Sequence, residues 1–319
     1  MIIINEADIA LLTDPKELVG VIVDAMKSHA NGDFIMPDRS HVDMEDNTLL
    51  LMPAASGKYF GTKLVSLFPD NTKKNEPVLY GTVILNDGET GKPLALLNGA
   101  KLTAVRTAAV GAVGVKYTSE SKNSTLGLIG AGVQGYHQVL FACAIRPIKR
   151  VCIFDAYHPD LNSFVSRLKT ELPDVEFVIS QNSEELCAES EIIITATNST
   201  SPVLPDNSDL LEGKHVISIG SYKPEMIEVP DSLFSLVDDV YIDVEMAVDE
   251  SGDLIQPMDR GVLDKSRIKL LSSIISQDSE ILAGTSFFKS VGMALFDLFT
   301  AKYLYEKALE KNIGQKVDF

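Results

Sequence analysis

Two patterns of apolar and polar residues divide the chain, and they meet near residues 118–124. In the first part, the runs NTLLLMPA, YFGTKLVSLF and PVLYGTVILND are rich in strand-forming residues, and turn clusters such as MEDN and NDGETGKP bound them. This pattern predicts short strands in one meandering sheet. A helix is predicted before them over residues 15–31, with Asp14 as its N-cap, Pro15 at its first position and Gly32 as its stop.

From residue 124 onward, strands and helices alternate. The runs TLGLIGAG, RVCIFDA, EFVIS, EIIITATN, HVISIGS and DVYID are short and almost continuously apolar, and most are separated by helical or polar stretches. Such strands are buried on both faces, so they predict an α/β fold with a doubly wound parallel sheet. A long amphipathic helix follows from about residue 290 and can fold back on the first part. We therefore expect the parallel sheet over residues 120–289, inserted between residues 1–119 and 290–319, which form one α+β domain.

The charge balance disfavours some classes of partner. The 319 residues carry a formal net charge of -17, from 45 acidic against 28 basic side chains, which disfavours nucleic acid and anionic membrane surfaces. No apolar run approaches the roughly 20 residues of a membrane span, and the N-terminus lacks the basic start of a signal peptide. Cys143, Cys152 and Cys187 have no metal-ligand spacing and are expected to be reduced, buried thiols. These features predict a cytoplasmic protein without a bound metal.

A glycine-rich turn joins the first strand of the parallel region to the helix after it. Residues 127–137, GLIGAGVQGYH, contain Gly130-x-Gly132-x-x-Gly135 between the strand TLGLI and the helix VQGYHQVLFACAI. In a dinucleotide-binding turn, the first glycine permits the tight bend and the second lets the backbone approach the pyrophosphate. The third lets helix and strand pack closely. Because the free N–H groups of the helix start face the phosphates, we predict a dinucleotide cofactor here.

Asp155 bears on which dinucleotide is bound. It ends the next strand, 20 residues after Gly135. A carboxylate at this point accepts hydrogen bonds from the adenosine ribose and repels a 2′-phosphate, so NAD(H) is favoured over NADP(H). His158 and Lys149 are near enough to bind a phosphate, so NADP(H) stays possible. The alternative interpretation of Asp155 is an ordinary carboxylate at a strand end.

Arg106 stands out in the run LTAVRTAAVGAVGV, where its neighbours are almost all small or apolar. A buried guanidinium without an anionic partner is costly, so Arg106 needs one. A substrate carboxylate bound through two hydrogen bonds would satisfy it, and a structural salt bridge is the alternative. For Arg39 in MPDRSHV and Lys63 in YFGTKLVSLF, a solvated surface charge is the default interpretation.

These features together resemble the ornithine cyclodeaminase/μ-crystallin family over nearly the whole chain. The resemblance rests on MPDRSHV, LLLMPA, FGTKLVS, GTVILNDGETGKPLALLNGAKLTAVRTAA, GLIGAGVQGYHQ, TATNSTSPVL, ISIGSYKPEMIEV and FKSVGMALFDL. The run that ends in RTAA, combined with this glycine turn, is its most specific part. The resemblance implies a homodimer, with a Rossmann domain for the cofactor. It also implies that the two chain ends together form the domain for substrate binding and dimerisation.

The resemblance also implies roles for individual residues. Arg39, Lys63 and Arg106 would hold the α-carboxylate of the substrate, with Gly292 beside it. Lys63, Arg106 and Ser221 are the candidate catalytic residues, with Lys63 facing the carboxylate and Ser221 a neutral contact near the nicotinamide. The residues implied at the cofactor are Thr82, Arg106, Gly130, Gly132, Val133, Gln134, Gly135, Asp155, Thr195, Ala196, Thr197, Ser221 and Val291.

Two positions favour one branch of this family. Ornithine cyclodeaminases carry an Asp at the position of Ser221 and a Glu at that of Leu50, and both acids suit a diamine substrate. Without them, the chain is similar to the ketimine reductases. This branch implies NAD(P)H-dependent reduction of a small cyclic imino acid, Δ1-pyrroline-2-carboxylate to L-proline and the piperideine homologue to L-pipecolate. Ornithine cyclodeaminase, alanine dehydrogenase and a non-catalytic μ-crystallin-like binding protein remain the alternatives.

Overall fold

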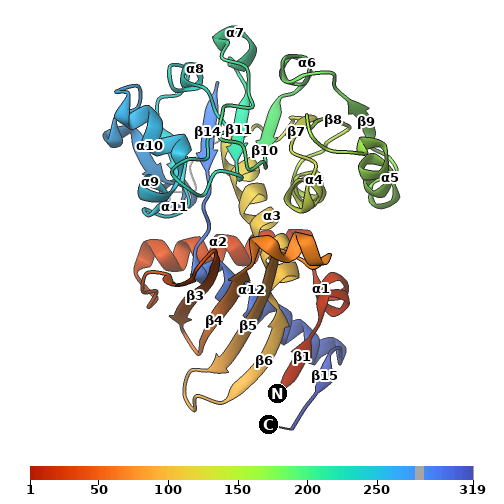
Figure 1. The fold of residues 1–319 in the computed structure, drawn as a ribbon, viewed down its shortest axis with the longest axis vertical. Coiled ribbons are helices and arrows are strands. Elements are labelled where there is room, and N and C mark those ends of the chain that lie inside the picture. The colour runs from red at the N-terminus through yellow and green to blue at the C-terminus, as the bar shows by residue number, and fades with distance from the viewer. Residues whose placement is uncertain (277–283, 319) are drawn as a thin grey trace. The chain divides into compact units, whose positions relative to one another are not determined.

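The chain folds into two compact units (Figure 1), and the sequence of one unit is inserted into the sequence of the other. The computed structural model describes residues 1–276 and 284–318. The first unit comprises Met1–Arg106 and Met293–Phe319, and the second comprises Thr107–Gly292. Helix α3 (Gly99–Thr118) therefore contributes its first turns to one unit and the rest to the other. The predicted insertion of one sheet between the two chain ends is confirmed.

The first unit contains a mostly antiparallel sheet. Among the described residues, seven strands follow the order β15-β1-β6-β5-β4-β3-β2. Strands β2 to β6 pair in sequence order as an antiparallel meander, while β1 joins β6 in parallel. The three predicted strands correspond to β3, β4 and β5, whereas β2 and β6 were not predicted. Their bounds are β1 Ile2–Ile4, β2 Ser40–Met44, β3 Asn47–Ser56, β4 Tyr59–Leu67, β5 Leu79–Asp87, β6 Pro93–Asn98 and β15 Gln315–Lys316.

The first unit also contains helices, of which α12 packs on the sheet. They are α1 (Glu6–Leu12), α2 (Pro15–Asn31), the start of α3 and α12 (Ala294–Lys311), with a short 3-10 helix at Pro69–Lys74. Helix α2 has the predicted ends, because Asp14 accepts a hydrogen bond from the Glu17 amide and Gly32 ends the helix at a φ of 74°. Helix α12 packs against α2 and strands β3, β4 and β5.

The second unit contains a parallel sheet. Eight strands of the described residues follow the order β13-β12-β14-β11-β10-β7-β8-β9, and all their pairings are parallel. The strand order reverses between β7 and β10, as in a doubly wound dinucleotide-binding sheet. The predicted Rossmann fold is confirmed. The bounds are β7 Thr125–Ile129, β8 Arg150–Phe154, β9 Glu176–Ile179, β10 Ile192–Thr195, β11 His215–Ser218, β12 Val240–Ile242, β13 Ile268–Leu270 and β14 Ser286–Lys289.

Helices connect most of these strands. The predicted helix after the glycine turn is α4 (Val133–Ile145), and the others are α5 (Leu161–Glu171), α6 (Ser183–Glu189), α7 (Ser208–Leu211), α8 (Asp231–Phe234), α9 (Ala247–Glu250), α10 (Gly252–Asp259) and α11 (Leu271–Ser276), with a 3-10 turn at Lys265–Arg267. Strands β10, β11 and β14 are buried along their whole length, so the core lies on both faces of the sheet. None of the helices in the described part of the chain is long and apolar enough to cross a membrane.

Candidate active site

Two of the predicted substrate-binding residues meet in the first unit. Lys63 lies on β4 and Arg106 on α3, and their side chains are only 3% and 8% exposed. A third residue, Asp297 on α12, joins them. Its Oδ2 lies 2.8 Å from the Lys63 Nζ, and its Oδ1 accepts a hydrogen bond of 3.0 Å from the Arg106 Nε. The cluster therefore holds two cations around one buried carboxylate.

The alternative interpretation of Arg106, a structural salt bridge, is confirmed, because Asp297 supplies an anionic partner within the protein. This contact uses only the Nε of the guanidinium. The two terminal nitrogens of Arg106 make no hydrogen bond to any residue that the structure describes, so they are available to a planar anion such as a carboxylate. The salt bridge thus uses one nitrogen of the guanidinium, and the binding of a substrate carboxylate by the other two stays a prediction.

Burial controls the charge of Lys63. The pKa of this ammonium is lowered to about 8, mainly because it is removed from water; the Asp297 carboxylate opposes this, and Arg106 and Arg39 add to it. Lys63 and Asp297 border a small cavity between β3, β4, β5 and α12. Most of its remaining lining is apolar: Met52, Gly61, Thr62, Val83, Ile84, Ala294, Leu298 and Ala301. Lys63 is therefore not the solvated surface charge that its sequence context suggests.

The sheet register separates other predicted residues from this cluster. Leu50 pairs with Val65 and thus shares the face of Lys63, whereas Thr82 pairs with Leu64 and lies exposed on the opposite face. Arg39 precedes β2, is half-buried, and acts on Lys63 through its charge. The structure thus brings Arg39, Lys63 and Arg106 near one another but not Thr82.

The glycine turn has the geometry of a phosphate cradle. Gly130 has a φ of 102°, and a Cβ atom there would lie 2.6 Å from the Ala196 carbonyl oxygen. A Cβ on Gly135 would lie 2.0 Å from the Gly130 oxygen, so helix α4 and strand β7 need this glycine to pack. Gly132 is different, because its φ is -82° and a Cβ would meet no protein atom within 4 Å. The protein's own packing does not explain this glycine, whereas a closely approaching ligand does.

The start of helix α4 fits the same ligand. No side chain caps this helix, so its first amide groups have no side-chain acceptor. Val133 is 67% exposed there, and the Oε1 of Gln134 is buried without a hydrogen-bond partner in the described structure. A bound nucleotide can donate a hydrogen bond to this buried oxygen, and its phosphates can accept hydrogen bonds from the first amides of the helix.

Asp155 lies where a ribose-binding carboxylate is expected, and it also braces the backbone. Its Oδ2 accepts a hydrogen bond of 2.8 Å from the Ala131 amide in the glycine turn. Its Oδ1 accepts from the amides of Tyr157 and His158, at 2.9 and 3.0 Å. The carboxylate therefore links the end of β8 to the glycine turn. The alternative interpretation, an ordinary carboxylate at a strand end, does not include this link.

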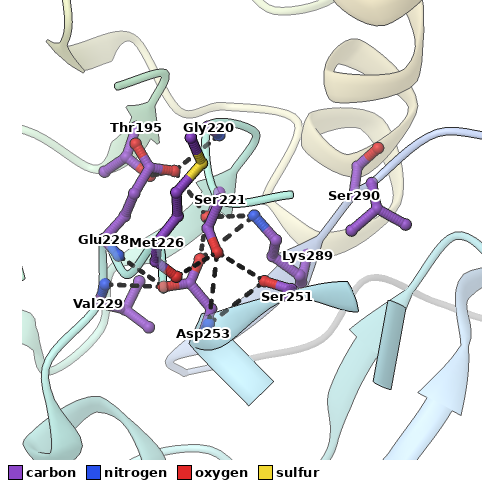
Figure 2. A network of polar contacts seen from close by, with 12 residues as sticks. Thr195, Gly220, Ser221, Met226, Glu228, Val229, Ser251, Asp253, Lys289 and Ser290 are labelled. Carbon is purple, nitrogen blue, oxygen red and sulfur yellow. Dashed lines mark hydrogen bonds and ion pairs between the residues drawn. The ribbon is translucent and has the colours of Figure 1, made fainter. Parts of the chain in front are cut away.

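A fully buried carboxylate, that of Glu228, holds together the ends of β10 and β11. Its Oε1 accepts from the amide and hydroxyl of Thr197, and its Oε2 accepts from Thr195, Ser218 and the Gly220 amide. Figure 2 labels Glu228 together with two of these partners, Thr195 and Gly220. Thr195 and Thr197 are predicted cofactor residues, but sequence reasoning missed Glu228. Its only signal is an acid placed between the apolar residues Ile227 and Val229.

The same network extends to Asp253, Lys289 and Ser221 (Figure 2). Lys289 Nζ lies 3.2 Å from an Asp253 carboxylate oxygen, and both side chains are fully buried. Ser221 is also buried, and its hydroxyl lies 2.7 Å from the Met226 carbonyl oxygen and 2.8 Å from the Ser251 hydroxyl. Within the second unit, Ser221 is thus part of a structural hydrogen-bond network. Its contact with the nicotinamide stays a prediction.

A further buried acid fixes the segment between β14 and α12. Asp243 accepts hydrogen bonds from the Ser290 hydroxyl and from the amides of Val291 and Gly292. Val291 and Gly292 are the two residues of this segment that the family resemblance places at the ligands. Asp243 therefore sets the backbone there, although nothing in its sequence context, DVYIDVEM, separates it from the acids around it.

Comparisons with known proteins agree with this geometry. The sequence model of the ornithine cyclodeaminase/mu-crystallin family matches residues 2–312. A Δ1-pyrroline-2-carboxylate reductase of Bacillus cereus is 33% identical over 334 aligned residues, which cover 100% of both chains. The structure of the Thermococcus litoralis Δ1-pyrroline-2-carboxylate reductase in complex with NADH and L-proline is 31% identical, with a TM-score of 0.91, and the match covers 99% of this chain and 100% of that one. An archaeal alanine dehydrogenase dimer with bound NAD is 27% identical, with a TM-score of 0.88 and coverage of 100% and 99%.

Proposed function

Because the chain belongs to the ornithine cyclodeaminase/mu-crystallin family, we propose that it is an NADH-dependent reductase of a small cyclic imino acid. The family prediction made from the motifs is confirmed. The reaction that we propose is Δ1-pyrroline-2-carboxylate plus NADH and a proton to L-proline and NAD⁺, with the six-membered homologue as a second substrate. Full-length similarity to the reductases of Bacillus cereus and Thermococcus litoralis supports it.

The observation that carries the proposal is the cluster of Lys63, Arg106 and Asp297. Its two cations and one anion leave a net positive charge, and the terminal nitrogens of Arg106 have no partner among the described residues. A bidentate carboxylate fits this arrangement. When the carboxylate is bound in this way, the ring of the imino acid has a fixed orientation. Orienting the substrate toward the cofactor is the main contribution of the protein to hydride transfer.

Residues of the second unit would hold the cofactor. Gly132 leaves room for the pyrophosphate, the first amides of α4 face it, and Asp155 favours the adenosine ribose of NADH over that of NADPH. NADH supplies the hydride when it is bound. Thr195, Ala196, Thr197 and Val291 are the further residues that we propose at this site, with Ser221 near the nicotinamide.

The side chains at two positions argue against the cyclodeaminase alternative. Leu50 lies on the same face of the sheet as Lys63, and it is an alkyl group where a diamine substrate needs a counter-charge. Ser221 is neutral, and its hydroxyl already has protein partners. A buried ammonium without an anion is disfavoured by several kcal/mol, whereas a cyclic imino acid presents no second amine.

We also propose that the protein acts as a homodimer. In the sheet register, Val42, Met44, Phe60, Leu64 and Tyr80 lie on the face opposite Lys63, and each is between 38% and 47% exposed. Apolar side chains gathered on one sheet face are a feature of protein interfaces. The similar archaeal alanine dehydrogenase is a dimer.

A cytoplasmic location fits the chemistry of the cysteines. Cys143, Cys152 and Cys187 are free thiols. Burial raises the pKa of Cys143 and of Cys187 to about 12, so these two thiols are unreactive near neutral pH. Free thiols of this kind suit a reducing compartment.

A substrate panel tests the proposal. The oxidation of NADH and of NADPH is followed with Δ1-pyrroline-2-carboxylate, Δ1-piperideine-2-carboxylate, and pyruvate with ammonia, and the release of ammonia from ornithine is followed with NAD⁺. We expect NADH oxidation with the two imino acids and none of comparable rate with the others. Faster turnover of pyruvate with ammonia would favour an alanine dehydrogenase, and sustained ammonia release from ornithine would favour a cyclodeaminase.

A further inference from the structure

The Asp297 carboxylate has polar contacts with both cations of the substrate cluster. Its side chain is 2% exposed, and within the described residues its partners are the Lys63 ammonium and the Arg106 guanidinium. It lies within α12 and does not cap this helix, whose N-cap is Met293. The three residues come from β4, α3 and α12, so the contact is not a by-product of one local element.

We propose that Asp297 is a positioning residue of the substrate site, which holds Lys63 and Arg106 side by side and keeps the Lys63 ammonium charged. The identity of the ligand rests on the proposed function, but the effect on Lys63 does not. Two unit charges of one sign repel each other strongly when they are buried, and an anion between them offsets that repulsion. Lys63, Arg106 and Asp297 together still carry two positive charges against one negative charge, so the cluster attracts a carboxylate.

The charge state of Lys63 depends on a balance that Asp297 shifts. The charged groups that act on Lys63 are Asp297 from α12, Arg106 from α3 and Arg39 from the segment before β2. Burial and the two guanidinium groups favour the neutral amine, and Asp297 alone among these groups favours the ammonium. The resulting pKa of about 8 leaves Lys63 mostly charged at neutral pH.

The sign of the pH effect follows from this balance. Lys63 is charged below its pKa and neutral above it, and only the charged form attracts a carboxylate. The kcat/KM for the imino acid should therefore fall as the pH rises through about 8. Replacing Asp297 by a neutral side chain removes the group that raises the pKa of Lys63, so the fall should move to lower pH.

The test compares wild-type protein with Asp297→Asn. Its first measurement needs no substrate: the titration of Lys63 is followed by NMR in protein labelled with [ε-13C]lysine, and the signal is assigned by its absence in Lys63→Arg. The second is the pH dependence of kcat/KM for Δ1-pyrroline-2-carboxylate at saturating NADH. Titration of the substrate itself affects both proteins equally and cancels in the comparison.

Glu191→Gln is the matched control, because Glu191 also accepts several partly buried hydrogen bonds but lies just before β10, outside both candidate sites. We expect Asp297→Asn to lower the Lys63 pKa by about one unit or more and the control to leave it unchanged. We also expect the KM for the imino acid to rise about tenfold near neutral pH while the KM for NADH changes little, because one charge-assisted contact is lost.

An unchanged Lys63 titration in Asp297→Asn would overturn the proposal. Asp297→Ser is the second neutral variant and serves in the same way if the Asn protein does not fold. Asp297→Glu keeps the charge, so a Lys63 titration close to that of the wild type is expected there. If wild-type protein reduces no imino acid, the proposed function fails, while the NMR titration still decides the role of Asp297.

Discussion

At the scale of single residues, Arg106 carries the largest predicted effect. We expect Arg106→Ala to lower kcat/KM for the imino acid roughly 30-fold or more, because a buried contact with the carboxylate is lost. This factor corresponds to a loss of about 2 kcal/mol of transition-state stabilisation. The far-UV circular dichroism spectrum should not change, since Asp297 keeps Lys63 as its partner. Arg106→Lys is the control: it keeps the charge and should recover part of the loss. Wild-type kcat/KM in Arg106→Ala would rule out the carboxylate role.

The choice of cofactor is the second prediction at this scale. Asp155→Asn should raise the KM for NADH about tenfold and improve the relative use of NADPH, because one charge-assisted bond to the ribose weakens and repulsion of a 2′-phosphate is relieved. Asn keeps one carbonyl oxygen for the backbone amides that Asp155 binds, whereas Ser would also loosen the turn. The measurement is the ratio of kcat/KM for NADH and NADPH. If this ratio does not move, His158 becomes the first candidate for cofactor choice.

The sequence predicts some of these residues better than others. Gly130 and Gly132 could be identified because glycines directly after an apolar strand are characteristic of a dinucleotide-binding turn. Arg106 could be identified because it is a charged residue among small apolar ones. Asp297 breaks its pattern in the same way, in MALFDLF, but its role depends on Lys63, which is 234 positions earlier. No local pattern shows which charges meet, so the internal partner of Arg106 was missed.

At the scale of elements, Glu228 couples two strand ends that carry predicted cofactor residues. Glu228→Gln places an amide donor against the Gly220 amide or the hydroxyls of Thr195 and Ser218, so at least one buried bond is lost. A buried donor left without an acceptor costs about 1–3 kcal/mol. We expect the melting temperature to fall by several degrees, and the KM for NADH to rise more than the KM for the imino acid.

Glu191→Gln separates positioning from stability in this experiment. Glu191 joins the N-terminal ends of β7 and β10, whereas the glycine turn follows the C-terminal end of β7. Its loss should also lower the melting temperature but leave the KM for NADH near that of the wild type. Equal changes in KM in the two variants would show that Glu228 only stabilises the fold.

Elements with strong periodicity or clear caps were predicted well. Helix α2 has both predicted ends, and helix α4 begins directly after the glycine turn. Strands β13 and β14 and the short helices α8 to α11 were not identified. Helices of four to eight residues show little periodicity, and their ends are fixed by tertiary contacts such as the Asp253 carboxylate bound to the amides of Glu228 and Val229.

At the scale of the whole molecule, the open face of the antiparallel sheet leads to a prediction about assembly. Leu64→Glu places a charge in the middle of the exposed apolar face, and burying it in an interface would be costly. We expect this variant to be monomeric by size-exclusion chromatography with light scattering. Leu309→Glu is the control, because Leu309 is 50% exposed on α12, away from that face. A dimer that persists in Leu64→Glu would place the interface elsewhere.

The overall architecture was predictable because two different periods of hydrophobicity follow one another. Half-buried strands in sequence order gave the meander, and strands buried on both faces gave the parallel sheet. The strand order of the parallel sheet follows from the dinucleotide-binding topology once the glycine turn is placed in its first strand. What the pattern could not give is the addition of β1 and β15 to the meander, because strands of two or three residues carry no signal of their own.

The most direct test of the proposed function is the fate of the hydride. The protein is incubated with Δ1-pyrroline-2-carboxylate and NADH that carries deuterium at C4 of the nicotinamide ring, and the product is analysed by chiral chromatography and mass spectrometry. We predict L-proline with one deuterium on its α-carbon. The absence of labelled proline, with rapid labelling of alanine from pyruvate and ammonia instead, would contradict the assignment as an imino acid reductase.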